Sequence, residues 1–419
     1  MKKTETAAYD SGKYKWVMLA LLTVTYFLMH ATRQVFNAVL PQIKSGMPGV
    51  TDTELGMSRT VFLFAYALMV PFVGIATDFF RRKWVIVFGT AMFAISVFFT
   101  GYAESMLMLF VMYGVLNGVG QCMIPSAASS LVAQYHVTTR STALSIYQSA
   151  LYVGVVLSSL SAGSLSGLSA DGWRWPFWIF GGISLVWAAA LFFFLRDTPA
   201  LETEPGENKP KLKDACLAMV SKPSAWLITF AFGMLVFGSN CFRTWMPAYI
   251  QQQTHWNLST GWAAFHSVAW FFGGSFIGIA IGARMSDTLV HRRRGIRLEL
   301  MAIGLAVSAP AMAAMVYMPN VWLSGLMMLV FGIASGFFDC NLYAGLFEVV
   351  APRYRAAAMG VYLCGAFLIG CPATAVLGWV GQNFSLQHGI AMFAGTYALG
   401  AAAMFIARAK FFNRDKVEL

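Results

Sequence analysis

Charge is scarce along this chain. Charged residues make up 11% of its 419 residues, whereas hydrophobic residues make up 58%. A soluble globular domain carries about 25% charged residues, so most of this chain must face lipid or other apolar helices. The sequence also lacks a G-x-x-x-x-G-K-[ST] phosphate loop, an H-E-x-x-H zinc motif and a C-x-x-C pair. We therefore expect a membrane protein that is not an enzyme and has no cofactor or metal site.

Cysteine is present but carries no recognisable pattern. None of the six cysteines has metal-ligand spacing, and no pair falls in the predicted extracellular loops. A disulfide framework is thereby excluded, and we expect free thiols at Cys122, Cys216, Cys241, Cys340, Cys364 and Cys371.

Long apolar runs dominate what is present. A membrane span needs about 20 apolar residues, and by that measure the sequence predicts twelve helices. They lie near 16–43, 54–79, 84–102, 105–131, 142–163, 174–196, 223–250, 260–285, 297–318, 321–349, 357–380 and 388–412. A polar segment, 197–222, separates the sixth from the seventh. We expect an N-terminal six-helix bundle (1–196), a cytoplasmic linker (197–222) and a C-terminal six-helix bundle (223–419).

The positive charges behind the net charge of +11 follow the predicted membrane topology. Lysines and arginines concentrate before the first span, after every second span, in the linker and at the end of the chain. Positive loops stay in the cytoplasm, so we expect both termini there. This distribution excludes a nucleic-acid-binding face, and we expect an integral protein of a bacterial inner membrane.

The two halves repeat one arrangement of polar residues. Arg33 precedes Pro41 in the first span, and Arg243 precedes Pro247 in the seventh. An aspartate with a basic cluster follows, 37 residues after the first proline and 40 after the second; these groups include Asp78, Arg82, Asp287 and Arg293. A cation within hydrocarbon costs about 2.5–3.5 kcal/mol, so it marks a solute path or a buried partner. Repeated halves with polar groups near the midplane are typical of secondary transporters.

Short motifs resemble those of the major facilitator superfamily. The segment Gly74-Ile-Ala-Thr-Asp78-Phe-Phe-Arg81-Arg82-Lys83 resembles the family's G-x-x-x-D-R-x-G-R-R/K loop, with Phe79 in place of the arginine. The resemblance implies two six-helix bundles around a central cavity lined by the first, fourth, seventh and tenth helices. It also implies that Asp78, Arg82, Asp287 and Arg293 latch one conformation. The alternative is that these cations only anchor the loops.

Further motifs resemble the organophosphate:phosphate antiporter branch. They are Arg33-Gln-Val-Phe-Asn37-Ala-Val-Leu-Pro41, Leu116-Asn117-Gly118-Val-Gly120-Gln121, Gly172-Trp-Arg-Trp-Pro-Phe177 and Arg196-Asp-Thr-Pro199. The chain departs from that branch at Gln34, Leu151 and Ser239, where those exchangers have basic residues. The departures argue against phosphate exchange itself, while an anionic solute remains favoured.

Candidate solute contacts in the first half lie on three helices. Tyr26, His30, Arg33 and Asn37 are spaced 4, 3 and 4 apart, which places them on one helix face. An arginine there can hold a phosphate, carboxylate or sulfonate by two parallel hydrogen bonds; the alternative is a structural role for Arg33. Further candidates are the polar residues of the fourth and fifth helices, Asn117, Gln121, Gln148 and Tyr152.

In the second half, Arg243 and Asn240 are candidate contacts, and Asp339 is a candidate proton carrier. A buried carboxylate that can gain and lose a proton suits coupling, whereas the alternative is a fixed salt bridge with an arginine. We interpret Glu348, near Pro352 and Arg353, as a structural latch of the loop after the tenth helix.

These observations favour one function. The sequence predicts an all-helical secondary transporter for a small organic anion, a phosphate ester, carboxylate or sulfonate, driven by proton symport or by exchange for another anion. We expect a monomer in the lipid membrane. An alternative is a proton-coupled exporter of drugs or other lipophilic compounds, which should instead show membrane acids without arginines. A receptor or scaffold without transport is a third, and it would not need a polar midplane.

Overall fold

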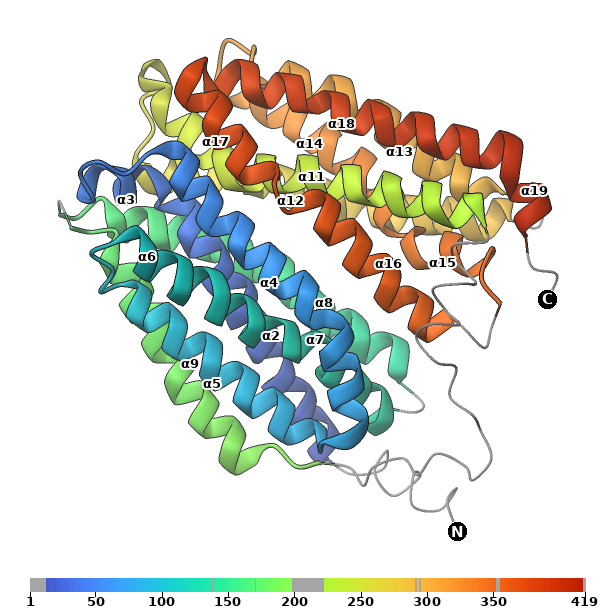
Figure 1. Ribbon diagram of the computed structural model, residues 1–419, viewed down its shortest axis with the longest axis horizontal. Coiled ribbons are helices and arrows are strands. Elements are labelled where there is room, and N and C mark those ends of the chain that lie inside the picture. Colours follow the sequence, from blue (N-terminus) through green and yellow to red (C-terminus); the bar gives the residue numbers. More distant parts are fainter. Residues whose placement is uncertain are drawn as a thin grey trace. The chain divides into compact units, whose positions relative to one another are not determined.

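The computed structural model is all-helical over the residues it describes (Figure 1), which are 13–136, 139–169, 171–197, 222–290, 292–293, 295–351 and 355–416; side chains at 74–79, 141 and 355–357 are not described. Twelve of the described helical segments are long and apolar enough to cross a membrane. The predicted fold class and number of spans are therefore confirmed. Most of the predicted linker, residues 198–221, lies outside the description, as does Cys216.

The described residues form two compact units. The first takes those of Met1–Val50, Val61–Glu204 and Ser259–Phe265, and the second takes those of Thr51–Thr60, Pro205–Leu258 and His266–Leu419. The helices from the N-terminal half are α2 (Tyr14–Ala38), α3 (Leu40–Gly46), α4 (Asp52–Phe79), α5 (Arg82–Thr100), α6 (Met106–Leu109), the π-helical η1 (Phe110–Leu116), α7 (Asn117–Tyr135), α8 (Arg140–Ser166) and α9 (Arg174–Phe194).

The remaining elements come from the C-terminal half. They are α11 (Pro223–Gln252), η2 (Thr254–Trp256), α12 (Thr260–Leu289), α13 (Ile296–Met315), α14 (Val321–Asp339), α15 (Leu342–Phe347), α16 (Arg355–Gly370), α17 (Ala373–Asn383), α18 (Leu386–Ile406), the π-helical η4 (Ala407–Phe411) and α19 (Phe412–Asp415).

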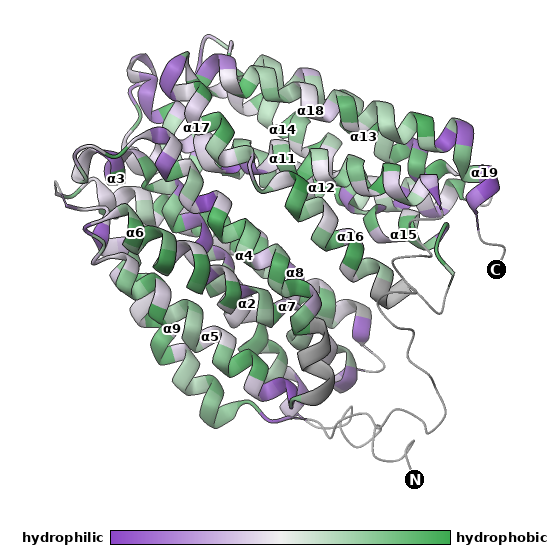
Figure 2. Cartoon of the chain, viewed as in Figure 1, coloured by the Kyte–Doolittle hydropathy of each residue, from purple (hydrophilic) through white to green (hydrophobic). Residues whose placement is uncertain are grey.

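Apolar residues cover the lengths of the helices in both units, while hydrophilic residues gather at many helix ends (Figure 2). Phe88 on α5 and Val186 on α9 are examples of large apolar side chains that stay exposed, at 61% and 74%. Lipid tails are as apolar as these side chains, so a spanning helix needs no polar outer face.

In the first unit, α2 packs against α8 and α9, and α5 packs against α7 and α9 (Figure 1). Glycine permits one of the close contacts, since a Cβ at Gly118 of α7 would lie 2.6 Å from the carbonyl oxygen of Phe62 on α4. Small residues let backbones approach in this way in membrane proteins. This close approach places Phe62 of α4 beside α7.

The first span is shorter than predicted, because α2 ends at Ala38 and the chain bends at Val39 (φ −107°, ψ 12°) before α3 begins. Pro41 stands in the first turn of α3, where its missing N–H costs nothing, whereas inside a continued α2 it would remove a helical hydrogen bond. The corresponding proline, Pro247, lies inside α11, which continues to Gln252.

In the second unit, α11 packs against α16, α17 and α18, and α13 packs against α14 and α18. The tenth span, Val321–Phe347, is not one continuous helix. Its first part, α14, ends at Asp339, and Cys340 and Asn341 form a turn before α15 begins. Asp339 thus lies within the span but at a helix end.

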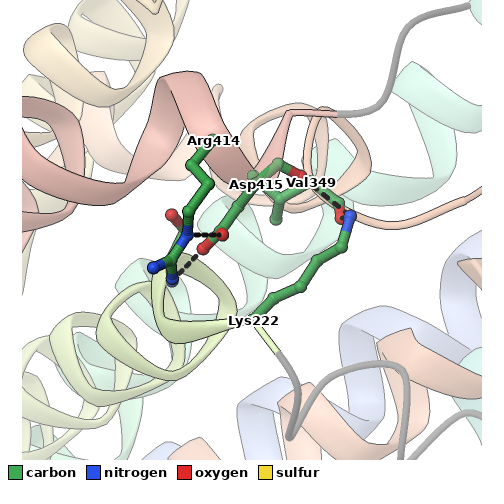
Figure 3. Close-up of polar contacts among 5 residues, drawn as sticks. Lys222, Val349, Arg414 and Asp415 are labelled. Carbon is green, nitrogen blue, oxygen red and sulfur yellow. Dashed lines mark hydrogen bonds and ion pairs between the residues drawn. The ribbon is translucent and has the colours of Figure 1, made fainter.

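A polar cluster joins the beginning of α11 to the end of α19 (Figure 3). Nζ of Lys222 donates to the carbonyl oxygens of Val349 at 2.7 Å and Asp415 at 2.8 Å. The Asp415 carboxylate accepts from the backbone N–H of Ser224 at 2.9 Å and from Nε of Arg414 at 3.1 Å. Burial lowers the pKa of Lys222, and the nearby Asp415 partly offsets that shift. The cluster satisfies one of the N–H groups that a helix start leaves without an internal partner.

Candidate functional site

Arg33 lies near the end of α2, half-buried, at the centre of the polar cluster of the first unit. Its Nε donates to Oε1 of Gln121 on α7 at 2.9 Å, and Nε2 of Gln121 donates to Oδ1 of Asn117 at 2.9 Å. The same Nε2 lies 3.4 Å from the hydroxyl of Thr32. The structure thus brings Arg33, Asn117 and Gln121 together, as three members of one hydrogen-bond network from two helices.

Two aromatic rings of α4 flank the Arg33 guanidinium. Its central carbon is 5.0 Å from the ring centroid of Phe62 and 5.3 Å from that of Tyr66. Such cation–π contacts stabilise a desolvated cation by about 2 kcal/mol. Gln121, Phe62 and Tyr66 are all neutral, so these contacts orient the guanidinium without neutralising it. The chemistry available here is the binding of a negatively charged group.

The predicted polar stripe of α2 divides into two parts. The ring of Tyr26 lies 4.5 Å from that of His30 and 4.4 Å from that of Tyr147 on α8. Asn37 turns to its own helix, where Nδ2 donates to Oε1 of Gln34 at 3.0 Å. Oδ1 of Asn37 and Nε2 of Gln34 are buried and have no hydrogen-bond partner among the described residues. Gln34, named above only as a departure from the antiporter branch, therefore pairs with Asn37.

On α8, neither member of the predicted pair is buried. Gln148 is exposed and Tyr152 is half-buried, whereas Tyr147 is fully covered at 1% exposure. Periodicity could not identify this face, because both the lipid-facing and the core-facing sides of a membrane helix are apolar.

Arg243 lies about 30 Å along α11 from Pro223, at 1.5 Å per residue. Its guanidinium is 5.9 Å from the ring centroid of Phe271 and 5.6 Å from that of Phe272, both on α12. Asp339 is within electrostatic reach of Arg243, and its side chain is exposed on the second unit. The structure therefore groups the two charged candidates of the second half in one unit.

Asn240 does not contribute its amide to this group. Its Nδ2 donates to the carbonyl oxygen of Val236, one turn earlier on the same helix, at 2.9 Å. Its neighbour Ser239 instead meets Tyr397 of α18, with 3.1 Å between the hydroxyl oxygens.

An aromatic triad recurs in both units and fixes the register of the repeat. Phe36 and Phe62 lie 4.0 and 5.8 Å from Tyr113 in the first unit. In the second, Phe242 and Phe271 lie 5.2 and 5.0 Å from Phe331, and the members occupy matching helices: α2 and α11, α4 and α12, η1 and α14.

Counting from the prolines gives the same correspondence. Phe36 precedes Pro41 by five residues, as Phe242 precedes Pro247. In this register Arg33 matches Ser239, and Arg243 matches Asn37. The two arginines therefore stand at different depths, four residues or about 6 Å apart along a helix.

The predicted latch residues differ in their exposure and contacts. The side chain of Asp78 lies outside the description; Arg82 is half-buried at the start of α5, and Asp287 is exposed near the end of α12. Arg293 lies 3.7 Å from Glu299, whose carboxylate also accepts from Nε of Arg408 at 3.0 Å. The sequence interpretation did not single out Glu299 or Arg408.

Glu348 also forms an ion pair in the second unit, accepting from Nη1 of Arg297 at 3.0 Å. This contact joins the segment after α15 to the start of α13, which fits the predicted structural role of Glu348.

Within the described part of the chain, no group of three or more His, Cys, Asp or Glu side chains could hold a metal ion. The cysteines found there, Cys122, Cys241, Cys340, Cys364 and Cys371, are free thiols.

Comparison with known proteins gives a consistent result. A family model described as Major Facilitator Superfamily matches residues 22–374. The chain is 25% identical over 388 residues to the probable sulfoacetate transporter SauU of Cupriavidus necator, covering 88% of this chain and 87% of that protein. It is 24% identical to the chloroplastic ascorbate transporter of Arabidopsis thaliana, covering 92% of this chain and 73% of that one.

A crystal structure of a bacterial homologue of the human lysosomal transporter Spinster, inward-facing and unoccupied, is similar in fold. The TM-score is 0.85 at 21% identity, with 97% of this chain and 99% of that chain covered.

Proposed function

Since the chain belongs to the major facilitator superfamily, and is thus an integral membrane transporter and not an enzyme, we propose that it carries a small organic anion by alternating access. The observation that carries this proposal is Arg33, whose charge is held in place by Gln121 and two aromatic rings. A guanidinium can bind a carboxylate, phosphate or sulfonate through two parallel hydrogen bonds.

The relatives support an anionic solute. Those similar to this chain include proteins named as transporters of sulfoacetate and of ascorbate, and a sodium-dependent phosphate transport protein. Sulfoacetate carries a sulfonate and a carboxylate, both of which suit an arginine.

Asp339 and Arg243 support proton coupling in the second unit. A carboxylate that takes up a proton loses its charge, and its ion pair with a nearby arginine is then broken. We infer that Asp339 loads a proton in each cycle of symport. Exchange of one anion for another is the alternative mode, in which Asp339 and Arg243 remain a fixed pair.

The remaining assignments follow from the same account. Tyr26, His30, Asn37, Asn117, Gln121, Gln148, Tyr152, Asn240 and Arg243 are proposed to contribute to the solute path, and Asp78, Arg82, Asp287 and Arg293 to latch one state. We place the protein in a bacterial inner membrane as a monomer with cytoplasmic termini. Protection of a C-terminal tag from a membrane-impermeant label in intact cells would support that orientation, and labelling would refute it.

Uptake into proteoliposomes tests the proposal. The panel comprises sulfoacetate, malonate, glycerol phosphate and a lipophilic cationic drug, with Arg33→Gln beside the wild type. Arg174→Gln is the matched control, because Arg174 donates to the carbonyl oxygens of Gly101 and Ala103 at 2.9 and 3.1 Å and so has a structural role.

We expect uptake of at least one anion, lost in Arg33→Gln and retained per folded molecule in Arg174→Gln. Transport of the drug alone, unchanged in Arg33→Gln, would refute anion transport and favour the lipophilic exporter.

A further inference from the structure

A tyrosine recurs at one position of the two halves. Tyr147 lies seven residues after Arg140 on α8, and Tyr362 lies seven residues after Arg355 on α16. Each ring packs on a ring of the first helix of its half, with 4.4 Å between the centroids of Tyr147 and Tyr26 and 5.1 Å between those of Tyr362 and Phe232.

The partners of the two tyrosines also match. Tyr26 precedes Pro41 by fifteen residues, and Phe232 precedes Pro247 by fifteen. The two tyrosines are therefore equivalent in the same register that the aromatic triads define.

Both hydroxyls are buried without a hydrogen-bond partner among the described residues. The side chains are 1% and 0% exposed, so bulk water does not reach them. A buried hydroxyl without a partner loses its hydration and gains nothing in return. Phenylalanine would fill the same space without that cost. A hydroxyl at such a position is therefore useful only where it has a partner in another state of the protein.

The surroundings of the two hydroxyls differ in charge. Tyr147 is within electrostatic reach of Tyr66, whose ring lies beside the Arg33 guanidinium. Tyr362 is instead within reach of the Asp339 carboxyl group. The charge beside the first environment is a cation, whereas the charge named in the second is an acid, so an anion is favoured more strongly near Tyr147. Only Tyr147 is thus suited to an anionic solute.

The position of Tyr147 also limits the shape of that solute. Its ring contacts Tyr26, which lies seven residues before Arg33, or about 10 Å along the helix axis. Tyrosine and arginine therefore approach a solute from different levels of α2. A solute with oxygen atoms at both ends can contact Tyr147 and Arg33 together. A solute with a single acidic group does so less well.

Resting on the proposed function, we infer that the Tyr147 hydroxyl donates a hydrogen bond to the second oxygen-bearing group of a two-ended anion whose acidic group is bound by Arg33. The ligand class is a short molecule with a carboxylate, sulfonate or phosphate at one end and a carboxylate or hydroxyl at the other. Tyr147 then acts as a specificity residue, because it distinguishes two-ended solutes from one-ended analogues.

The test uses matched pairs of anions with purified full-length protein in detergent. The pairs are sulfoacetate with methanesulfonate, malonate with acetate, and glycerol phosphate with methyl phosphate. Affinities are measured by titration calorimetry for the wild type, Tyr147→Phe, Tyr362→Phe and Arg33→Gln. Tyr362→Phe is the matched control, since it removes an equally buried hydroxyl beside an acid.

We expect Tyr147→Phe to weaken the two-ended member of the bound pair about tenfold, equivalent to about 1.4 kcal/mol, and to change the one-ended member less than twofold. Tyr362→Phe should change neither, and Arg33→Gln should weaken both. The melting temperature of solute-free Tyr147→Phe should equal or exceed that of the wild type.

Two results would overturn the inference while leaving the proposed function intact. One is that Tyr147→Phe weakens the affinity for both members of a pair equally, or for neither member, while Arg33→Gln still binds both members poorly. The other is a lower melting temperature of the solute-free variant, which would show that the hydroxyl has a partner within the protein. Normal anion binding by Arg33→Gln, or binding of no anion by the wild type, would instead overturn the proposed function.

Discussion

The hydrogen bond between Arg33 and Gln121 gives a prediction in which charge alone is changed. Nε of Arg33 donates to Oε1 of Gln121 at 2.9 Å. The substitution Gln121→Glu replaces that amide by a carboxylate of nearly the same size. The arginine then holds an acid of the protein itself, and its charge is no longer available to a solute.

The size of the effect follows from the separation of the charges. Two unit charges 4 Å apart interact by about 4 kcal/mol at an effective dielectric constant of 20, and part of this is lost to desolvation of the new carboxylate. If about 2.7 kcal/mol remains, the affinity for an anion falls about 100-fold. Folding should be unaffected or slightly favoured, because the carboxylate has a partner.

The control is Gln121→Leu, which removes the hydrogen-bond acceptor and adds no charge beside Arg33. A hydrogen bond to a charged group contributes about 1.5–3 kcal/mol, and the aromatic rings of Phe62 and Tyr66 still flank the guanidinium. We expect lower stability and a loss of affinity of about tenfold or less.

Titration calorimetry with the transported anion, beside thermal unfolding, measures both quantities. The predicted order of affinity is wild type, then Gln121→Leu, then Gln121→Glu. An anion affinity of Gln121→Glu equal to that of the wild type would refute the reasoning, because a neutralised Arg33 could not then be the anion site.

Two further predictions concern the second unit. Asp339→Asn should abolish uptake driven by a proton gradient while preserving exchange of labelled for unlabelled anion, because the amide cannot carry the proton; gradient-driven uptake at the wild-type rate in proteoliposomes would exclude this role. Asp415→Asn should lower the melting temperature by about 1 °C, for a loss of about 1 kcal/mol, because the carboxylate that accepts from Ser224 and Arg414 loses its charge. Uptake per folded molecule should not change, and an unchanged melting temperature would show that this cluster contributes little to stability.

The sequence was sufficient for the fold because its signals there are strong. Twelve apolar runs and the alternation of basic loops predict the spans directly, and the structure contains twelve such helices among its described residues. Helix breaks were harder to predict. Pro41 lies two residues after the bend at Val39, in the first turn of α3, whereas Pro247 is accommodated inside α11, and the choice between the two depends on tertiary packing.

At the candidate site, residue types were more predictable than contacts. Arg33 and Gln121 could be placed on the first and fourth helices, but their 2.9 Å hydrogen bond depends on the rotation and register of α2 and α7. Tyr147 was missed in favour of its neighbour Gln148 because polarity suggested exposure to a cavity, while packing on Tyr26 determines which residue is buried. Ring packing between distant segments leaves no periodic signal in a sequence.

The most direct test of the central claim is the affinity of Arg33 variants for the anion that the wild type carries. The account predicts that Arg33→Gln loses about 100-fold in affinity, equivalent to about 2.7 kcal/mol. Arg33→Lys should fall between the two, since lysine keeps the charge but cannot form two parallel hydrogen bonds. If Arg33→Gln folds and binds the anion as tightly as the wild type, Arg33 is not the anion site and the account is contradicted.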